Sequence, residues 1–169
     1  SSVAKFAEVY FGVISKSATK ADMLFIYNWN ETDTPAVLKG GKLSSLGELK
    51  KLNGKLKITL GGVNVDISVN FSTADSFSSA ANLLQTAIRG ATGQDSNNNF
   101  KKAEVTYSTH TDGFIIKGGL KGEGEKIDYI TAPQDGTDIS NKLGLTLAEG
   151  ATILNGVGGV ATLAEALKE

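Results

Sequence analysis

The sequence predicts an α+β fold, in which a largely antiparallel sheet of β-hairpins carries two or three helices on one face. The first supporting observation is a pair of alternating runs on either side of Gly61-Gly62, the pattern of a β-hairpin with one solvated face. The second is a helical stripe that follows, which Asp75 or Ser76 would cap. The apolar positions are Leu56, Ile58, Leu60, Val63, Val65, Ile67, Val69 and Phe71 in the hairpin, and Phe77, Ala80, Ala81, Leu84 and Ile88 in the helix.

Before this hairpin, the chain predicts one buried strand and one short helix. The continuous apolar run Met23–Tyr27 fits a strand that is buried on both faces. Ser44 or Ser45 can cap a short helix, and Asn53-Gly54 would end it because glycine readily adopts the left-handed conformation. The apolar residues of that helix are Leu46, Leu49 and Leu52.

After the long helix, a second hairpin is predicted. Residues 103–107 alternate, Thr111-Asp112-Gly113 forms a turn, and Phe114–Ile116 opens the returning strand. We expect residues 118–124 to form a flexible connection and 127–130 a short strand. Further elements are a brief helix that Thr137 or Asp138 caps and Gly144 closes, and a weakly ordered glycine- and alanine-rich connector over 145–160.

The amino-acid composition argues against an enzyme and favours a binding or structural protein. The chain has 169 residues, which suits one ordinary domain or one domain plus part of another, and its net charge of -1 argues against a nucleic-acid-binding role. It contains no cysteine and one histidine, so thiolate sites and multi-histidine zinc sites are excluded. No apolar run approaches the ~20 residues that span a bilayer, and the opening residues do not form a signal peptide. We therefore expect no membrane partner.

Few residues suggest chemistry, and each has a simpler interpretation. His110 could pair with Asp112 as an acid/base element, but no Gly-x-Ser-x-Gly elbow is present, and an exposed hairpin histidine explains it better. The loop Gly156–Gly159 could hold a phosphate, but no Lys-Ser/Thr follows it, so a hinge is the simpler reading.

Charged residues likewise form no recognisable site. The loose acidic pairs lack the spacing of a calcium loop, and Asp138 is better explained as a helix cap. Paired carboxylates for glycoside hydrolysis stay open, although nothing favours them. The clustered lysines suggest a solvated face and protection of a sheet edge. We assign no catalytic, cofactor-binding or metal-binding residue and expect no cofactor. The acidic pairs are Glu31/Asp33, Glu123/Glu125 and Asp135/Asp138, and the lysines are Lys50, Lys51, Lys55 and Lys57.

Both ends of the sequence carry partial helix patterns. Val3, Phe6, Ala7 and Tyr10 follow helical spacing, and Thr162–Glu165 reads as a capping box that starts a helix at about residue 161. We interpret the chain as an internal fragment of a longer protein, with frayed native termini as the alternative.

Three segments resemble the tail-sheath-like proteins of contractile-tailed bacteriophages. They are an aromatic-glycine helix end, an apolar strand followed by a tryptophan loop and a Pro-Ala-x-Leu-x-Gly turn, and a closing Gly-Thr-Asp…Leu-Gly-Leu segment. The middle, 46–88, is similar to hairpin-then-helix modules inserted in such sheaths, and also to short repeats of flagellar hook-associated proteins. The three segments are Phe6–Gly12, Met23–Gly41 and Gly136–Ala151.

This resemblance implies a structural protomer of a helical assembly that contracts around the tail tube and needs no cofactor. Residues 1–41 would belong to a shared core domain, 42–160 to an inserted, outward-facing and protease-resistant domain, and 161–169 to the start of a truncated helix. The partners would be other sheath protomers and the tail tube, in a virion assembled in the bacterial host cytoplasm. The isolated fragment would be monomeric, because the assembly contacts of such sheaths lie in other regions.

A second class of function is an adhesin-like surface module that binds a carbohydrate or a receptor through its loops. An exposed aromatic platform would favour that alternative. Aromatic residues make up only 7% of the chain, and most of them occupy apolar positions of the predicted elements. The structural role is therefore preferred, and an enzyme ranks third.

Overall fold

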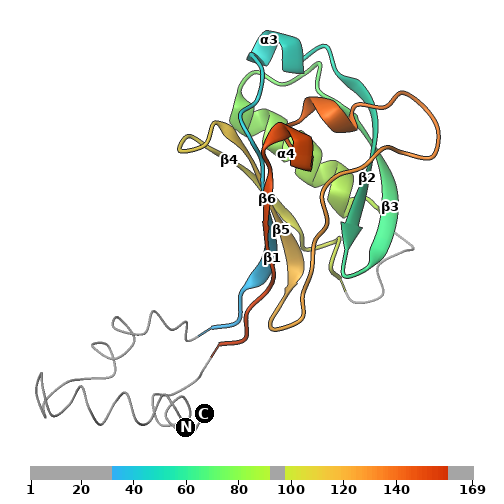
Figure 1. Ribbon diagram of the computed structural model, residues 1–169. Coiled ribbons are helices and arrows are strands. Elements are labelled where there is room, and N and C mark those ends of the chain that lie inside the picture. The colour runs from blue at the N-terminus through green and yellow to red at the C-terminus, as the bar shows by residue number, and fades with distance from the viewer. Residues whose placement is uncertain (1–31, 92–97, 160–169) are drawn as a thin grey trace, which may run out of the picture. The chain divides into compact units, whose positions relative to one another are not determined.

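The computed structural model describes residues 32–91 and 98–159. The chain divides into two units, one made of Pro35–Val157 and the other of Ser1–Thr34 with Gly158–Glu169. Nearly all of the second unit lies outside the described residues. The predicted strand Met23–Tyr27 and both terminal helix patterns fall there, whereas the described helices and strands lie within Pro35–Val157 (Figure 1).

Four antiparallel strands form the larger sheet, in the order β4-β5-β1-β6. The strand β1 lies between β5 and β6, with Leu38 opposite Ile116 on one side and Ile153 on the other. The first and last strands of the unit are thus neighbours, as Figure 1 shows. The strands are β1 (Pro35–Lys39), β4 (Glu104–Ser108), β5 (Gly113–Lys121) and β6 (Thr152–Leu154).

The predicted first hairpin is present, formed by β2 (Asn53–Leu60) and β3 (Val63–Asn70). Its register runs without interruption from Leu60 opposite Val63 to Asn53 opposite Asn70. The turn residues Gly61 and Gly62 have φ of 57° and 80°, the left-handed values that a tight two-residue hairpin turn requires.

A segment far along the chain covers the other edge of β2. The backbone of Lys57 exchanges two hydrogen bonds with Thr131, of 2.9 and 3.1 Å, and Lys55 N–H donates to the carbonyl of Thr137 at 2.6 Å. Lys55 and Lys57 are half-buried under this segment. The expectation that these lysines protect an open edge is therefore wrong, because backbone pairing already closes that edge.

Helix α4 (Phe77–Arg89) packs against both β3 and β4 and so joins the two sheets. A reciprocal capping box between Ser76 and Ser79 starts it, and Ala80, Ala81, Leu84 and Ile88 are its buried face. Val65 and Phe77, which the sequence also assigns to this core, are only half-buried but still pack against it.

The remaining helices are short. Helix α3 (Leu46–Leu49) begins where Ser45 caps it, and two single-turn 3₁₀ helices follow β5: η1 (Ser140–Lys142) and η2 (Leu147–Glu149). Antiparallel sheets of four and two strands with so few helices confirm the predicted α+β class.

The core lies where the two sheets meet. Phe71, directly after β3, stacks on Phe114 of β5 with 6.4 Å between ring centroids, and both side chains are fully buried. These two rings connect the hairpin to the larger sheet, so the two sheets share one hydrophobic core.

The structure corrects several local predictions. Asn53-Gly54 does not end a helix but opens β2, where a Cβ on Gly54 would lie 2.4 Å from the Thr137 carbonyl oxygen. Gly118 belongs to β5 rather than to a flexible connection. Residues 127–130 form an isolated bridge at Ile127 rather than a strand, and Ile130 N–H donates to the Leu145 carbonyl at 3.1 Å. The predicted connector 145–160 contains η2 and β6. The compact unit starts at Pro35, because β1 pairs with β5 and β6, whereas the inserted domain expected at 42–160 stays a prediction.

Candidate interaction surface

His110, the sequence's acid/base candidate, is exposed at the tip of the β4–β5 hairpin. Its backbone N–H donates to Ser108 Oγ at 3.2 Å. The carboxylate of Asp112 instead accepts a hydrogen bond of 3.1 Å from the Tyr107 hydroxyl. This geometry fits the interpretation of His110 as a surface turn residue.

Tyr107 is anchored on both sides. Its ring stacks on Phe77 with 4.8 Å between centroids. Burial raises the pKa of its hydroxyl above the ordinary value, and the hydrogen bond to Asp112 and the negative charge of that residue raise it further. The phenol therefore stays protonated and serves as a hydrogen-bond donor that holds the hairpin turn.

The glycine loop considered for phosphate binding uses its amides within the protein. Gly156 N–H donates to the carbonyl of Glu125 at 2.8 Å. Gly159 N–H donates to Asp33 Oδ1, also at 2.8 Å. Because these two donors already have acceptors, this loop does not present the set of open amides that a phosphate site needs.

The acidic candidates are likewise engaged separately. Asp138 Oδ1 accepts a 2.8 Å hydrogen bond from Ser140 N–H, and the hydrogen bonds from Ser140 lower the pKa of that carboxyl below its ordinary value. Asp135 pairs with Lys55 at 2.9 Å. Over residues 32–91 and 98–159, no group of three or more His, Cys, Asp or Glu side chains could hold a metal ion.

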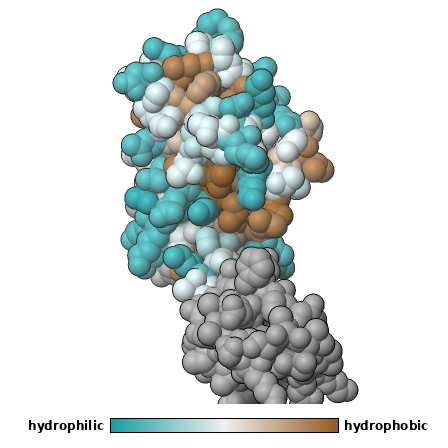
Figure 2. All heavy atoms as spheres, turned by 90° about the vertical axis from the view of Figure 1, so that its left-hand side faces the viewer, coloured by the Kyte–Doolittle hydropathy of each residue, from teal (hydrophilic) through white to brown (hydrophobic). Residues whose placement is uncertain are grey.

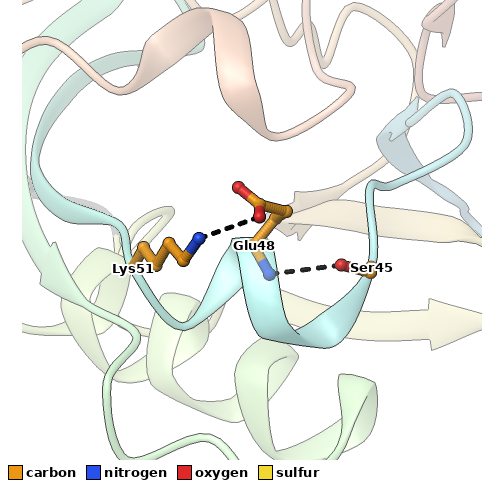
Figure 3. A network of polar contacts seen from close by, with 3 residues as sticks. All are labelled: Ser45, Glu48 and Lys51. Carbon is orange, nitrogen blue, oxygen red and sulfur yellow. Dashed lines mark hydrogen bonds and ion pairs between the residues drawn. The ribbon is translucent and has the colours of Figure 1, made fainter.

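A surface hollow of about 560 Å³ lies between α3 and the two 3₁₀ helices. Its two carboxylates are satisfied internally: Glu48 accepts from Lys51 at 2.9 Å, and Glu149 accepts from Gly144 N–H and Thr146 Oγ1, each at 2.8 Å. Figure 3 shows Ser45 capping α3 through Glu48 N–H, beside the Glu48–Lys51 pair. The hollow is a mixed-charge surface depression with no convergent catalytic groups.

Exposed apolar side chains are the other candidates for contact. Leu147 on η2 is 67% exposed, Leu154 on β6 is 52% exposed, and Val157 is 50% exposed. Figure 2 shows the face on the left of Figure 1 as mostly hydrophilic, with apolar groups at a few places between the polar ones. Isolated apolar residues are normal on a surface, so they offer contact points rather than a defined docking site.

The aromatic platform that would favour an adhesin is not found in the part of the chain that the structure describes. Phe71 is fully buried, and Phe77 and Tyr107 stack on each other. Trp29 and Phe25 lie outside the described residues. Nor does any helix over residues 32–91 and 98–159 have the length and apolar character needed to cross a membrane.

Comparison with known proteins gives one informative match. A family model described as the insert domain of the E217 tail sheath protein gp31 matches residues 33–157, close to the compact unit Pro35–Val157. No curated protein matches the chain. The matched span covers most of the 169 residues and confirms the resemblance read from the sequence. The chain therefore belongs to the family of phage tail sheath proteins that carry this insert domain.

Proposed function

We propose that this protein is a structural protomer of a contractile phage tail sheath, and that Pro35–Val157 is an outward-facing domain inserted into it. The observation that carries the proposal is the near coincidence of two independent boundaries, the matched span 33–157 and the compact unit 35–157. Of residues 1–41, those before Pro35 would belong to the core sheath domain. Residues from Pro35 onward, including β1, would belong to the inserted domain. A further helix would start at about residue 161.

The proposed mechanism is packing rather than bond-making. Energy is stored in the contacts between protomers of the extended, metastable array and is released when the array contracts. Helical arrays arise when identical heterologous contacts do not close into a ring. The partners are other protomers and the tail tube, and the assembled product is a virion component that forms in the host cytoplasm. No nucleic acid, membrane or cofactor takes part.

Labelling of intact tails tests this role. Antibodies raised against residues 33–157 should decorate purified phage tails along the whole sheath, in both the extended and the contracted state. Decoration confined to the tip of the tail would contradict a sheath role and would support the adhesin-like alternative. A preparation in which the epitopes become accessible only after denaturation would contradict the outward-facing position.

The isolated domain should be monomeric, because the assembly contacts are proposed to lie outside it. Light scattering of residues 33–157 at high concentration measures this directly. A stable dimer, ring or tube would place assembly surfaces within the inserted domain. A matched variant, Leu147→Ser, would then show whether Leu147, the most exposed large apolar side chain among the described residues, contributes to that contact.

The absence of catalysis is also testable. The chain has a single histidine and no cysteine, and His110 sits in an exposed turn. We expect no turnover of ester, glycoside or nucleotide substrates. Turnover that disappears in His110→Ala but persists in Ser108→Ala would overturn this expectation.

A further inference from the structure

The sequence contains four positions where Asn or Asp precedes glycine: Asn53-Gly54, Asp112-Gly113, Asp135-Gly136 and Asn155-Gly156. At such pairs, the backbone nitrogen of the glycine can attack the side-chain carbonyl carbon and close a five-membered imide. Glycine favours this reaction because it lacks a side chain and reaches the required backbone angles easily. The fold decides which of the four pairs can react.

Hydrogen bonding holds the two Asn-Gly pairs. Gly156 N–H donates to the Glu125 carbonyl at 2.8 Å. Phe71 N–H donates to the Leu52 carbonyl, so Leu52 and Phe71 form a hydrogen-bonded pair at the end of the hairpin. Hydrogen-bonded and non-hydrogen-bonded pairs alternate along an antiparallel ladder, so Gly54 and Val69 form the next hydrogen-bonded pair. The attacking nitrogen is therefore occupied in both pairs.

Packing holds the pair Asp112-Gly113. The Asp112 carboxylate accepts from Tyr107, and its carbonyl accepts from Leu43 N–H at 2.8 Å. Gly113 begins β5 opposite Ser108, and its Cα is so close to Gly41 that a Cβ would lie 2.4 Å from the Gly41 carbonyl oxygen. This backbone has little freedom to rotate into the attacking geometry.

The pair Asp135-Gly136 differs from the other three in its exposure and in the backbone nitrogen of its glycine. The Asp135 side chain is 79% exposed, and Gly136 is exposed with φ of 82°. Among the described residues, no acceptor takes the Gly136 N–H. Residues 134–136 form a bend between Thr131 and Thr137, the two points at which this segment is bonded to β2, and Gln134 N–H donates to Asp66 of β3 at 2.9 Å.

We propose that Asp135-Gly136 is the site of spontaneous isoaspartate formation in this protein. The Gly136 nitrogen forms a bond to Asp135 Cγ, the bond from Cγ to a carboxyl oxygen breaks, and one water molecule leaves. Water then opens the imide at either carbonyl and yields aspartate or isoaspartate. The sum is an isomerisation without an oxidant, a reductant or a change in mass.

Lys55 restrains the reaction. Its ammonium nitrogen lies 2.9 Å from Asp135 Oδ1, and its aliphatic stem lies beside Gly136, where a Cβ would be 2.9 Å from Lys55 Cδ. The ion pair must separate before the carboxyl group can turn toward the backbone nitrogen. Exposed pairs contribute about 0.2–1 kcal/mol, so removing this one should accelerate isomerisation by a factor of roughly 1.4 to 5.

Ageing of the folded chain in ¹⁸O-labelled water tests the site. Trypsin releases residues 127–142 and 103–117 as single peptides, which carry Asp135 and Asp112 respectively. Folded protein held for weeks at 37 °C should accumulate ¹⁸O-labelled isoaspartate at Asp135, detected by fragment sequencing. Asp112 should stay unlabelled, and Asn53 and Asn155 should show far less deamidation than in urea.

Three variants and a denatured control separate the possible results. In urea all four pairs should react, with the two Asn-Gly pairs fastest. Asp135→Glu should abolish the labelled product at this position, and Lys55→Met should speed its formation, whereas Lys57→Met should leave the rate unchanged. Isomerisation at Asp112 that equals or exceeds that at Asp135, or no product at Asp135, would overturn the proposal. An unchanged rate in Lys55→Met would overturn the role of Lys55.

Discussion

The hairpin β2–β3 and the sheet β4-β5-β1-β6 are built from the same kinds of residue but are specified in different ways. The hairpin uses one continuous stretch, and its turn glycines set its register. The sheet joins strands that are far apart in the chain, such as Val37 with Leu154. Alternation is enough to specify the first, whereas the second also depends on where backbones can approach closely. The following variants test that contrast, from the largest expected effect to the smallest.

Phe114→Ala should cause the largest loss, about 3–5 kcal/mol in the free energy of unfolding, because it removes a fully buried ring. Its stacking on Phe71 links the two sheets, so amide protection should fall in β2–β3 as well as in β4–β5. Urea unfolding and hydrogen exchange measure both effects. Protection that falls in only one sheet would show that the sheets unfold separately.

Within the hairpin, Ile67→Ala should destabilise by about 2–5 kcal/mol, because Ile67 is 5% exposed in the core. Its neighbour Asp66 is exposed and accepts one hydrogen bond, from Gln134 N–H at 2.9 Å, so Asp66→Ala should cost no more than about 1 kcal/mol. Thermal and urea denaturation compare the two. Equal losses would contradict the alternation on which this strand was predicted.

Close backbone approach is tested by Gly113→Ala. The added Cβ would lie 2.4 Å from the Gly41 carbonyl oxygen and 2.7 Å from that of Gly40, so we expect a loss of about 1–3 kcal/mol. Gly47→Ala is the matched control, because in α3 its nearest neighbour would be 3.9 Å away. This control should be neutral or gain up to about 1 kcal/mol. A neutral Gly113→Ala would mean that β1 and β5 tolerate a wider separation.

The smallest effect is a pH dependence at Asp138. Hydrogen bonds from Ser140 lower the pKa of this carboxyl in the folded state, so its stabilising contribution is present at neutral pH and is lost as the pH falls below about 4. Asp138→Asn keeps an acceptor for Ser140 N–H but does not titrate. The stability difference between the two proteins should change in favour of the variant between pH 7 and pH 3. A difference that is constant with pH would contradict this assignment.

Local signals explain which parts of the fold the sequence predicts. The Gly61-Gly62 turn, the Ser45 and Ser76 caps and the apolar stripe of α4 are all encoded within a few neighbouring residues. They agree with the structure because turn and capping chemistry acts over that range.

Pairing between residues far apart in the chain explains why other local predictions were wrong. Gly54 resembles a helix end, but it is glycine because the Thr137 carbonyl lies against it. The strand β6 has only three residues, too few to show alternation, and β1 pairs with it from more than 100 positions earlier. The ion pair between Lys55 and Asp135 also depends on tertiary structure alone, so the spacing of these residues along the sequence could not reveal it.

One further consequence follows from the position of β1 beside β6. Because these strands are antiparallel neighbours, with Val37 opposite Leu154 and Lys39 opposite Thr152, the chain enters and leaves the compact unit at one place. Tension applied to both ends would therefore open this pair like a zipper, loading its hydrogen bonds one after another rather than all together in shear. Such a pair yields at low force, whereas the core behind it, anchored by Phe71 and Phe114, would be spared. The β1–β6 pair, through which the chain enters and leaves this unit, is thus the part that yields first under tension.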